Sequence, residues 1–267
     1  MFRRLFSKQN RALLAELVRT DFKLRYQGSV LGYAWSLLRP LFLFLILYIV
    51  FTKVFNLGKD VPHYPVYLLL GIVLWNFFQE MTMQSLTSIV GRGELIRKIS
   101  IPRWIIPIST SLSALINLGL NLIVVLIFMI FSHVELMTTD YILPLLIFEI
   151  YILSLGVSFF LSALFVKFRD MSYIWEVILQ AGFYATPVIY ALSRITNATF
   201  KKLIMMNPLS QIIQDSRYVT ITHKTTTAYQ LFNGGFYEYI PFIILLIIII
   251  IGAIYFRFQS KYFAENV

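Results

Sequence analysis

The sequence contains no cysteine and little charge. Without cysteine, a disulfide framework and a thiolate metal site are both excluded. Only 13% of the 267 residues are charged, whereas a soluble domain carries roughly a quarter. In their place, 58% of the residues are hydrophobic, and several apolar runs reach the roughly 20 residues that a helix needs to cross the hydrocarbon layer. The sequence therefore predicts an all-α integral membrane protein.

The sequence also lacks the short motifs of nucleotide binding and hydrolysis. It has no G-x-x-x-x-G-K-[ST] phosphate loop, no H-E-x-x-H zinc motif and no G-x-S-x-G nucleophile turn. Its three histidines lie far apart, which argues against a metal site. The net charge of +10 could suggest nucleic acid, but in a membrane protein the placement of charge matters more than its sum. We expect no cofactor, no metal and no nucleic acid bound to this chain.

Apolar runs separated by turn and charge signals predict six transmembrane helices. They cover residues 35–55, 66–90, 104–131, 141–166, 171–191 and 239–258. Arginine and lysine are concentrated in the N-terminal segment, in the loops after the second and fourth spans, and in the C-terminal tail. Because short basic loops face the cytoplasm, both termini should lie on the cytoplasmic side of the cytoplasmic membrane.

Before the first span, residues 1–32 form a separate unit that is expected to lie at the membrane surface. Leucines such as Leu13 and Leu17 share one face of a predicted helix over 11–25, and basic residues share the other. Asp21 and Arg25 are four residues apart and could pair. Such a helix is expected along the cytoplasmic interface, and the alternative is an ordinary cytosolic helix. Residues 33–267 then form the transmembrane domain.

The stretch RYQGSVLGYAWSLLRP joins these two units. Gly28 and Gly32 supply the backbone freedom that a sharp turn into the membrane needs. Pro40 bends the helix that follows, and Arg39 lies near enough to the surface to extend its charge out of the lipid. One interpretation is a basic anchor with a kink. The other is that Arg25 and Arg39 bind an anionic headgroup or pyrophosphate.

LGYAWSLLRP resembles the signature that opens the first span of type-2 ABC exporter permeases of the polysaccharide kind. Further segments of the sequence resemble parts of that family in the same order: ELIRKISIPRWIIP at 94–107, FRDM at 168–171, TPVIY at 186–190 and NPLSQIIQDSRYV at 207–219. The resemblance covers nearly the whole chain. It implies a membrane subunit that works with a second copy of itself and two ATPase subunits, which bind ATP and magnesium.

The resemblance also implies a cargo and its route. A polysaccharide linked to a polyprenyl lipid would enter from the inner leaflet between the first and fifth spans, and a re-entrant pair of short helices at about 195–232 would lie near the exit. Flat rings with hydroxyl edges suit a sliding sugar chain. The expected substrate-contacting residues are Arg25, Tyr33, Trp35, Arg39, Tyr48, Phe51, Trp75, Phe183, Tyr184 and Tyr190.

A short cytoplasmic helix is expected to dock on the ATPase subunit. In the family this loop is a coupling helix, and the corresponding residues here are Glu94, Leu95, Ile96, Arg97 and Lys98. Lys167, Arg169 and Asp170 in the next cytoplasmic loop are expected to add a second contact. The rule that cytoplasmic loops are basic would explain the arginines equally well, but it does not explain Glu94 or the isoleucines.

Polar residues inside predicted spans leave two questions open. The second span carries a polar half from Gln79 to Ser88, which could serve helix packing or line a water-filled path. Glu176 could pair with Arg39 or Arg169, and Glu149 has no assigned partner.

The sequence leaves two other functions open. A drug or antibiotic exporter permease of the same family is one alternative. An enzyme acting on polyprenyl lipids is the other, but it would need clustered acids or histidines, and the cytoplasmic loops offer only Glu94 and Asp170.

Overall fold

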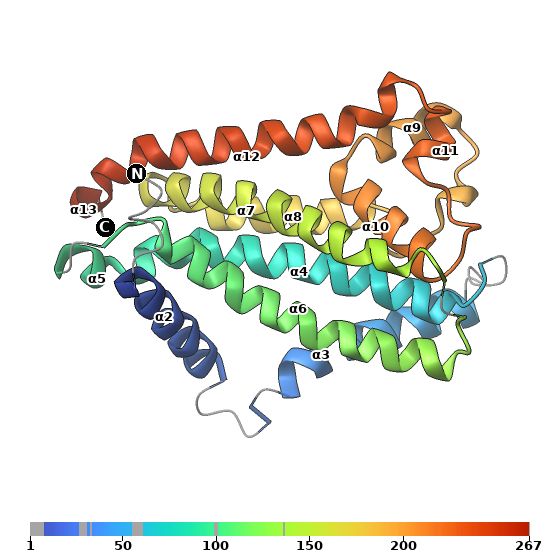
Figure 1. The fold of residues 1–267 in the computed structure, drawn as a ribbon, viewed down its shortest axis with the longest axis horizontal. Coiled ribbons are helices and arrows are strands. Elements are labelled where there is room, and N and C mark those ends of the chain that lie inside the picture. Colours follow the sequence, from blue (N-terminus) through green and yellow to red (C-terminus); the bar gives the residue numbers. More distant parts are fainter. Residues whose placement is uncertain are drawn as a thin grey trace.

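The structure is a computed structural model that describes residues 8–26, 31–32, 34–54, 61–98, 101–135 and 137–266. Within these ranges every regular element is a helix, and no strand is present. The α-helices, drawn in Figure 1, are α2 (Lys8–Tyr26), α3 (Ala34–Ile49), α4 (Tyr64–Gly91), α5 (Gly93–Lys98), α6 (Ile105–Phe131), α7 (Leu143–Lys167), α8 (Met171–Ala185), α9 (Ala198–Met205), α10 (Pro208–Thr220), α11 (Ala228–Phe232), α12 (Ile240–Gln259) and α13 (Phe263–Asn266).

The long helices lie side by side in an elongated bundle. Helices α4, α6, α7 and α12 run along the longest axis, with α3 and α8 beside them (Figure 1). Helices α2, α5 and α13 gather at one end of the bundle, and α9, α10 and α11 form a cap at the other end. The first and last described helices, α2 and α13, therefore lie at the same end.

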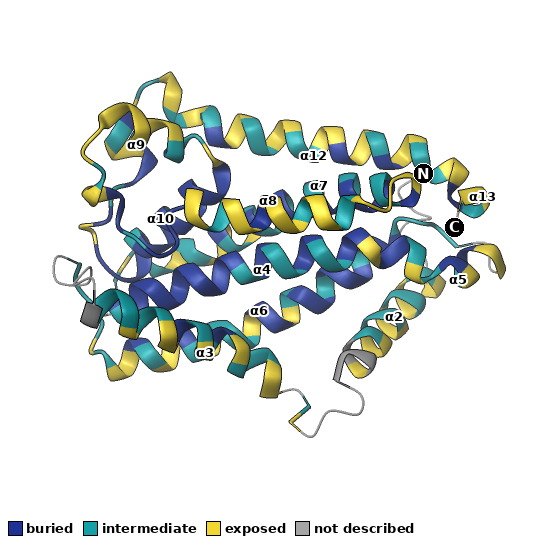
Figure 2. Cartoon of the chain, turned by 180° about the vertical axis from the view of Figure 1, so that it is seen from behind, coloured by how far each residue is buried: buried dark blue, intermediate teal, exposed yellow. Residues whose placement is uncertain are grey.

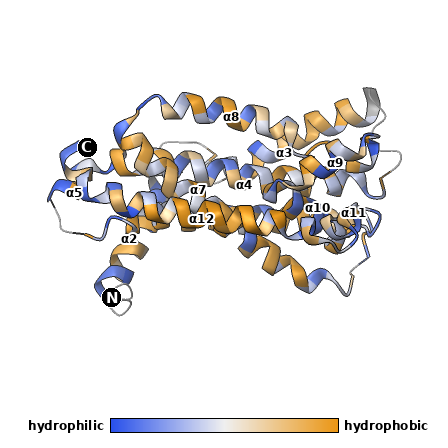
Figure 3. Ribbon diagram, turned by 90° about the horizontal axis from the view of Figure 1, so that it is seen from above, coloured by the Kyte–Doolittle hydropathy of each residue, from blue (hydrophilic) through white to orange (hydrophobic). Residues whose placement is uncertain are grey.

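Helix α4 forms the centre of the bundle. Nearly every residue from Tyr64 to Phe78 is buried, on all sides of the helix, as Figure 2 shows. A helix that is apolar all round belongs in an interior. Helix α12 is the opposite case, because most of its isoleucines and leucines are exposed. Figure 3 shows hydrophobic residues along almost the whole length of this helix. An exposed apolar surface of this length fits contact with lipid.

Five helical stretches among the described residues are long and apolar enough to cross a membrane. They are Ala34–Thr52, Tyr64–Gly91, Ile105–Phe131, Asp140–Lys167 and Phe236–Asn266. They match the first four and the last of the spans expected from the sequence. An all-α fold with five helices of spanning length is thereby established.

The expected fifth span is shorter than the sequence indicated. Helix α8 begins at Met171 but ends at Ala185, and Thr186 already has extended backbone angles. Fifteen residues of helix extend about 22 Å, less than the roughly 30 Å of a hydrocarbon core. Residues 186–191 continue as a non-helical segment.

Helices α7 and α12 approach each other closely at two glycines. A Cβ atom added to Gly252 would lie 2.1 Å from the carbonyl oxygen of Gly156, and one added to Gly156 would lie 2.8 Å from the Cα of Ile249. Small residues allow this approach, which is how helices gain packing energy inside a membrane. Neither glycine can be enlarged without separating the two helices.

Helix α2 packs its apolar side on the bundle, as its amphipathic pattern predicts. Leu13 and Leu17 are half-buried, whereas Glu16 and Arg19 are exposed. The Asp21 carboxylate pairs with Arg92, at the end of α4. The side chain of Arg25 and all of Gly28 lie outside the described residues.

Candidate functional site

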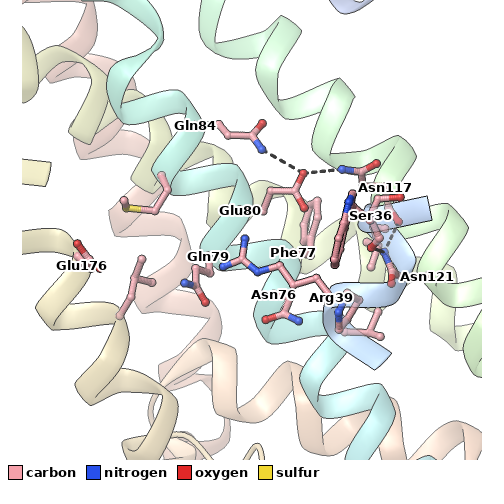
Figure 4. A pocket seen from close by; sticks show the side chains of 16 residues that line it. Ser36, Arg39, Asn76, Phe77, Gln79, Glu80, Gln84, Asn117, Asn121 and Glu176 are labelled. Atoms are coloured by element: carbon pink, nitrogen blue, oxygen red, sulfur yellow. Dashed lines mark hydrogen bonds between the residues drawn. The ribbon is translucent and has the colours of Figure 1, made fainter. Parts of the chain in front are cut away.

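A cavity of about 570 Å³ lies between α3, α4, α6 and α8. Polar side chains from all four helices line it (Figure 4), together with a few apolar ones. The polar lining consists of Ser36 and Arg39 from α3, Asn76, Gln79, Glu80 and Gln84 from α4, Asn117 and Asn121 from α6, and Glu176 from α8. A volume of this size suits a small ligand or part of a larger one.

Helical spacing explains why α4 and α6 turn polar side chains into the same space. Asn76, Glu80 and Gln84 follow one another at intervals of four residues, so they share one face of α4. Asn117 and Asn121 have the same spacing on α6. The two polar stripes border the cavity from neighbouring helices, as Figure 4 shows.

Hydrogen bonds hold this wall in place. The Glu80 carboxylate accepts a hydrogen bond from Asn117 Nδ2 at 2.7 Å and another from Gln84 Nε2 at 3.1 Å. Asn121 Nδ2 donates to the backbone oxygen of Ser36 at 3.3 Å, which connects α6 to α3. These bonds fix the position of the Glu80 carboxylate at the edge of the cavity.

The polar half of α4 serves helix packing and also lines the cavity. Thr82, Ser85 and Ser88 are buried and bond within the protein, for example Ser85 Oγ with Thr110 Oγ1 at 2.9 Å. Gln79 and Glu80 instead line the cavity. Helix packing therefore uses one face of the stretch, and the cavity uses another.

Arg39 and Glu176 bring opposite charges to the cavity. The Arg39 side chain is exposed and extends from α3 toward Gln79 on α4, whereas Glu176 lies on α8 (Figure 4). The two side chains form no ion pair with each other or with Arg169 among the described residues. The guanidinium is therefore available to a ligand.

Most of the aromatic residues expected to contact substrate lie away from this cavity. Trp35 lines it. Trp75 is buried in the core, where Phe183 packs edge-on against it with ring centroids 5.7 Å apart. Tyr48 stacks on Phe44, Phe51 is half-buried, and the Tyr190 hydroxyl donates to the backbone oxygens of Tyr184 and Ala185. The Tyr184 side chain, 67% exposed, faces outward from α8. Tyr33 and the side chain of Arg25 lie outside the described residues.

The lining residues that the sequence reasoning missed include three asparagines, Asn76, Asn117 and Asn121. A signal was present, because asparagine is rare and costly inside a membrane helix, and Asn117 and Asn121 share one face of a run that is otherwise apolar.

The charged residues expected to contact an ATPase lie at the end of the bundle that carries α5. Glu94 and Lys98 are exposed and pair with each other at 3.0 Å. Arg97, Lys167, Arg169 and Asp170 are also exposed, and Leu95 is half-buried. Ile96 faces inward, where it shares a hydrophobic cluster with Phe263 of α13, so it attaches α5 to the chain itself.

Arg92 connects this end to two other helices. Its guanidinium donates to Ser109 Oγ of α6 at 2.8 Å and pairs with Asp21 of α2. Arg92, directly before α5, therefore links α2 and α6 to the end of α4.

These features define a class of protein: a helical membrane protein with a polar cavity between its spanning helices and a charged helix at one end. The match to the ABC-2 type transporter family extends over residues 12–221, and the chain belongs to this family. It is therefore a transport subunit and not an enzyme.

Curated relatives give the comparison more detail. The chain is 28% identical over 222 residues to the O-antigen export system permease protein RfbA of Myxococcus xanthus, which covers 82% of this chain and 84% of that protein. It is 29% identical over 258 residues to the RfbA protein of Klebsiella pneumoniae, covering 95% and 94%. A second Klebsiella pneumoniae RfbA protein is 28% identical over the same length.

Proposed function

We propose that this chain is the membrane subunit of an ATP-driven exporter that carries a lipid-linked cell-surface polysaccharide across the cytoplasmic membrane. Membership of the ABC-2 family and the name O-antigen export permease of its relatives support this function. The observation that carries the proposal is the polar cavity between α3, α4, α6 and α8. A cavity lined by amides and carboxylates in an otherwise apolar bundle fits a cargo that is rich in hydroxyl groups.

The charges of the cavity suggest how the cargo is oriented. Arg39 would bind the phosphate groups that link the sugar to its polyprenyl carrier, because guanidinium and phosphate form charge-assisted hydrogen bonds. Glu80 and Glu176 would repel phosphate but accept hydrogen bonds from sugar hydroxyls. The lipid tail would remain in the inner leaflet beside α3 and α8, and the sugar would extend into the cavity.

Two copies of the chain would form the complete channel, with two ATPase subunits at the end that carries α5. ATP and magnesium would bind to those subunits. The basic residues near α2, α5 and α13 support a cytoplasmic position for this end and for both termini.

A sixth crossing would be completed by α8 together with residues 186–191. Helices α9 and α10 would then form a re-entrant pair at the outer end. Helix α10 supports this arrangement because eleven of its 13 residues are buried, and non-spanning backbone at membrane depth must be enclosed by protein.

The proposal is tested by deleting the gene and restoring it on a plasmid. Without the chain, we expect surface polysaccharide to be lost and lipid-linked polymer to accumulate inside the cell. The readouts are immunoblots of surface polymer and mass spectrometry of the lipid fraction. Normal surface polymer in the deletion strain, or a loss of drug resistance alone, would overturn the assignment and favour a drug exporter.

A further inference from the structure

A second cavity, of about 350 Å³, lies at the end of the bundle opposite α5. It is enclosed by α10, α11 and the beginnings of the spanning helices α7 and α12. Its lining includes two carboxylates, Asp215 and Glu238, the rings of Tyr218 and Tyr229, and the apolar side chains of Leu146 and Phe242. No lysine, arginine or histidine lines it.

The negative charge of this cavity has no counterion within the described part of the chain. Asp215 Oδ2 accepts a hydrogen bond from Gln211 Nε2 at 2.7 Å, but Oδ1 is buried and has no hydrogen-bond partner there. Neither Asp215 nor Glu238 takes part in an ion pair among the described residues. Glu149 of α7 lies near Asp215 but does not line the cavity, and its Oε1 atom has no hydrogen-bond partner among the described residues.

Uncompensated carboxylates out of water are costly, so such a cavity favours a positively charged ligand with N–H donors. The buried side chain of Gln211, which does not line the cavity, holds Asp215 in position. It is fully buried, and its amide nitrogen donates a hydrogen bond to Asp215. Its Oε1 atom has no hydrogen-bond partner among the described residues.

Aromatic rings around the cavity place it at the level of the lipid headgroups. Tyr141, Tyr229, Phe236, Tyr237 and Tyr239 are all more than half exposed and lie near the beginnings of α7 and α12 or on α11. Exposed aromatic residues at the ends of membrane spans form interfacial belts. The cavity therefore opens where headgroups lie.

The lining also distinguishes between kinds of cation. No group of three or more His, Cys, Asp or Glu side chains that could hold a metal ion is present in the described residues. The cavity instead has two tyrosine rings, and aromatic rings attract organic ammonium groups. Tyr229 is largely exposed, whereas the ring of Tyr218 also contacts that of His223, with centroids 4.6 Å apart. The cavity is also much larger than a bare ion requires.

We propose that this cavity binds the headgroup of an amine-bearing phospholipid, whose ammonium group donates hydrogen bonds to Asp215 and Glu238. The tyrosine rings flank the ammonium group, and the acyl chains lie along Leu146 and Phe242. The site is separate from the cavity that contains Arg39, so the inference requires only that the chain crosses a membrane and does not depend on its cargo.

The test uses the full-length protein in nanodiscs that contain equal amounts of phosphatidylethanolamine and phosphatidylglycerol. Native mass spectrometry measures which lipid stays bound after the disc is removed. We expect the wild-type protein to retain phosphatidylethanolamine in excess, and Asp215→Asn combined with Glu238→Gln to reduce that excess about tenfold, because two charge-assisted hydrogen bonds are weakened.

Glu135→Gln is the matched control, because it removes an exposed carboxylate at the same end but outside the cavity. This variant should retain the wild-type lipid ratio. Equal retention of the two lipids by the wild-type protein would overturn the proposal, and so would an unchanged ratio in the double variant.

Soluble ethanolamine distinguishes a lipid from a free amine. We expect millimolar ethanolamine to leave the bound lipid in place, because it lacks the acyl chains that contact Leu146 and Phe242. Displacement by ethanolamine, or by a lysine-rich peptide, would contradict the lipid assignment.

Acidification tests the site even if the double variant does not fold. Burial raises the pKa of Asp215 to about 6; the Gln211 amide and the nearby backbone of Ala228 oppose this rise, and Glu238 adds to it. Other titratable groups that face or adjoin the site are Glu149 from α7, Tyr218 from α10, His223 beside Tyr218, and Tyr229 from α11. Because Asp215 loses its charge as the pH falls through about 6, wild-type retention of phosphatidylethanolamine should drop between pH 7.5 and pH 5. Retention that does not change over this range would overturn the proposal.

Discussion

Arg39 is the residue on which the recognition of a phosphate in the first cavity depends. Replacing it with Gln removes the charge but keeps hydrogen-bonding capacity and most of the side-chain length. Charge-assisted hydrogen bonds contribute about 1.5–3 kcal/mol, so we expect export of the lipid-linked polymer to fall about tenfold or more in Arg39→Gln. Surface polymer measured at equal protein level tests this expectation.

Arg257→Gln is the control for that experiment, because Arg257 is another exposed arginine on a spanning helix and does not line the cavity. Its export should match the wild type. Arg39→Lys should fall between the two, since lysine keeps the charge but cannot form the paired bonds of a guanidinium. Full export by Arg39→Gln would reduce Arg39 to a membrane anchor.

At the residue scale, the roles of the expected substrate-contacting residues stay predictions, and the structure shows only where their side chains lie. Arg39 and Trp35 were expected at a binding site, and both line the cavity. Trp75 was expected beside substrate, but it is buried because Gly182 and Phe183 of α8 pack against its ring. Which face of an aromatic residue is covered depends on helix rotation, and the first half of α4, which is almost uniformly apolar, carries no pattern that reveals it.

At the scale of helices, the contact between α7 and α12 depends on Gly252. In Gly252→Ala the new methyl group would clash with the backbone of Gly156. Overpacking of this kind costs about 1–3 kcal/mol, so the melting temperature in detergent should fall. Gly119→Ala is the matched control, because a Cβ at Gly119 meets nothing within 4 Å, and alanine should stabilise a helix interior by about 0.5–1 kcal/mol. Equal melting temperatures for the two variants would contradict this account.

Arg217 joins three elements at the end that carries α10. Its fully buried side chain donates to the backbone oxygens of Tyr67 at 2.9 Å, and of Pro187 and Val188 at 2.5 Å each. Gly71 leaves room for it, since a Cβ there would lie 2.1 Å from Nη2.

Arg217→Lys should destabilise the protein, because a single ammonium group cannot reach all three carbonyls. Each buried carbonyl left without a donor costs about 1–3 kcal/mol. Thermal unfolding followed by tryptophan fluorescence should therefore show a lower midpoint than Arg257→Lys, in which the replaced side chain is exposed. A midpoint equal to the wild type would mean that lysine or water replaces all three bonds.

Arg217 also explains why the end of α8 was not predicted. Apolar residues continue past Ala185, so the sequence indicated one helix to Ala191. In the structure the carbonyls of Pro187 and Val188 turn toward Arg217 and do not continue a helix. The hydrogen-bond partner of these carbonyls lies about 30 residues further along the chain, so the local hydrophobic pattern does not reveal it.

At the scale of the whole molecule, hydropathy and charge predicted the arrangement well. The helical class, the extents of the long helices and the position of α2 and α13 at one end all follow from apolar runs and basic loops. The cavities were not predicted as such, because each depends on how several helices are rotated toward one another.

Force transmission from the ATPase to both copies of the chain would depend on the exposed side of α5. Glu94 and Lys98 form an exposed pair four residues apart, which stabilises a helix by only about 0.2–0.5 kcal/mol. Glu94→Arg should therefore leave the melting temperature nearly unchanged. If α5 docks on the ATPase, the same substitution should strongly reduce the rate of ATP hydrolysis by the reconstituted complex.

Exchanging the two charges separates docking from helix stability. The double variant Glu94→Lys with Lys98→Glu keeps an ion pair at the same spacing, so α5 should remain folded, but it presents the opposite charge pattern to the ATPase. We expect its ATP hydrolysis to be as low as that of Glu94→Arg. Hydrolysis restored to the wild-type rate would show that the pair acts only within α5, and the contact with the ATPase would then have to lie at Lys167, Arg169 and Asp170.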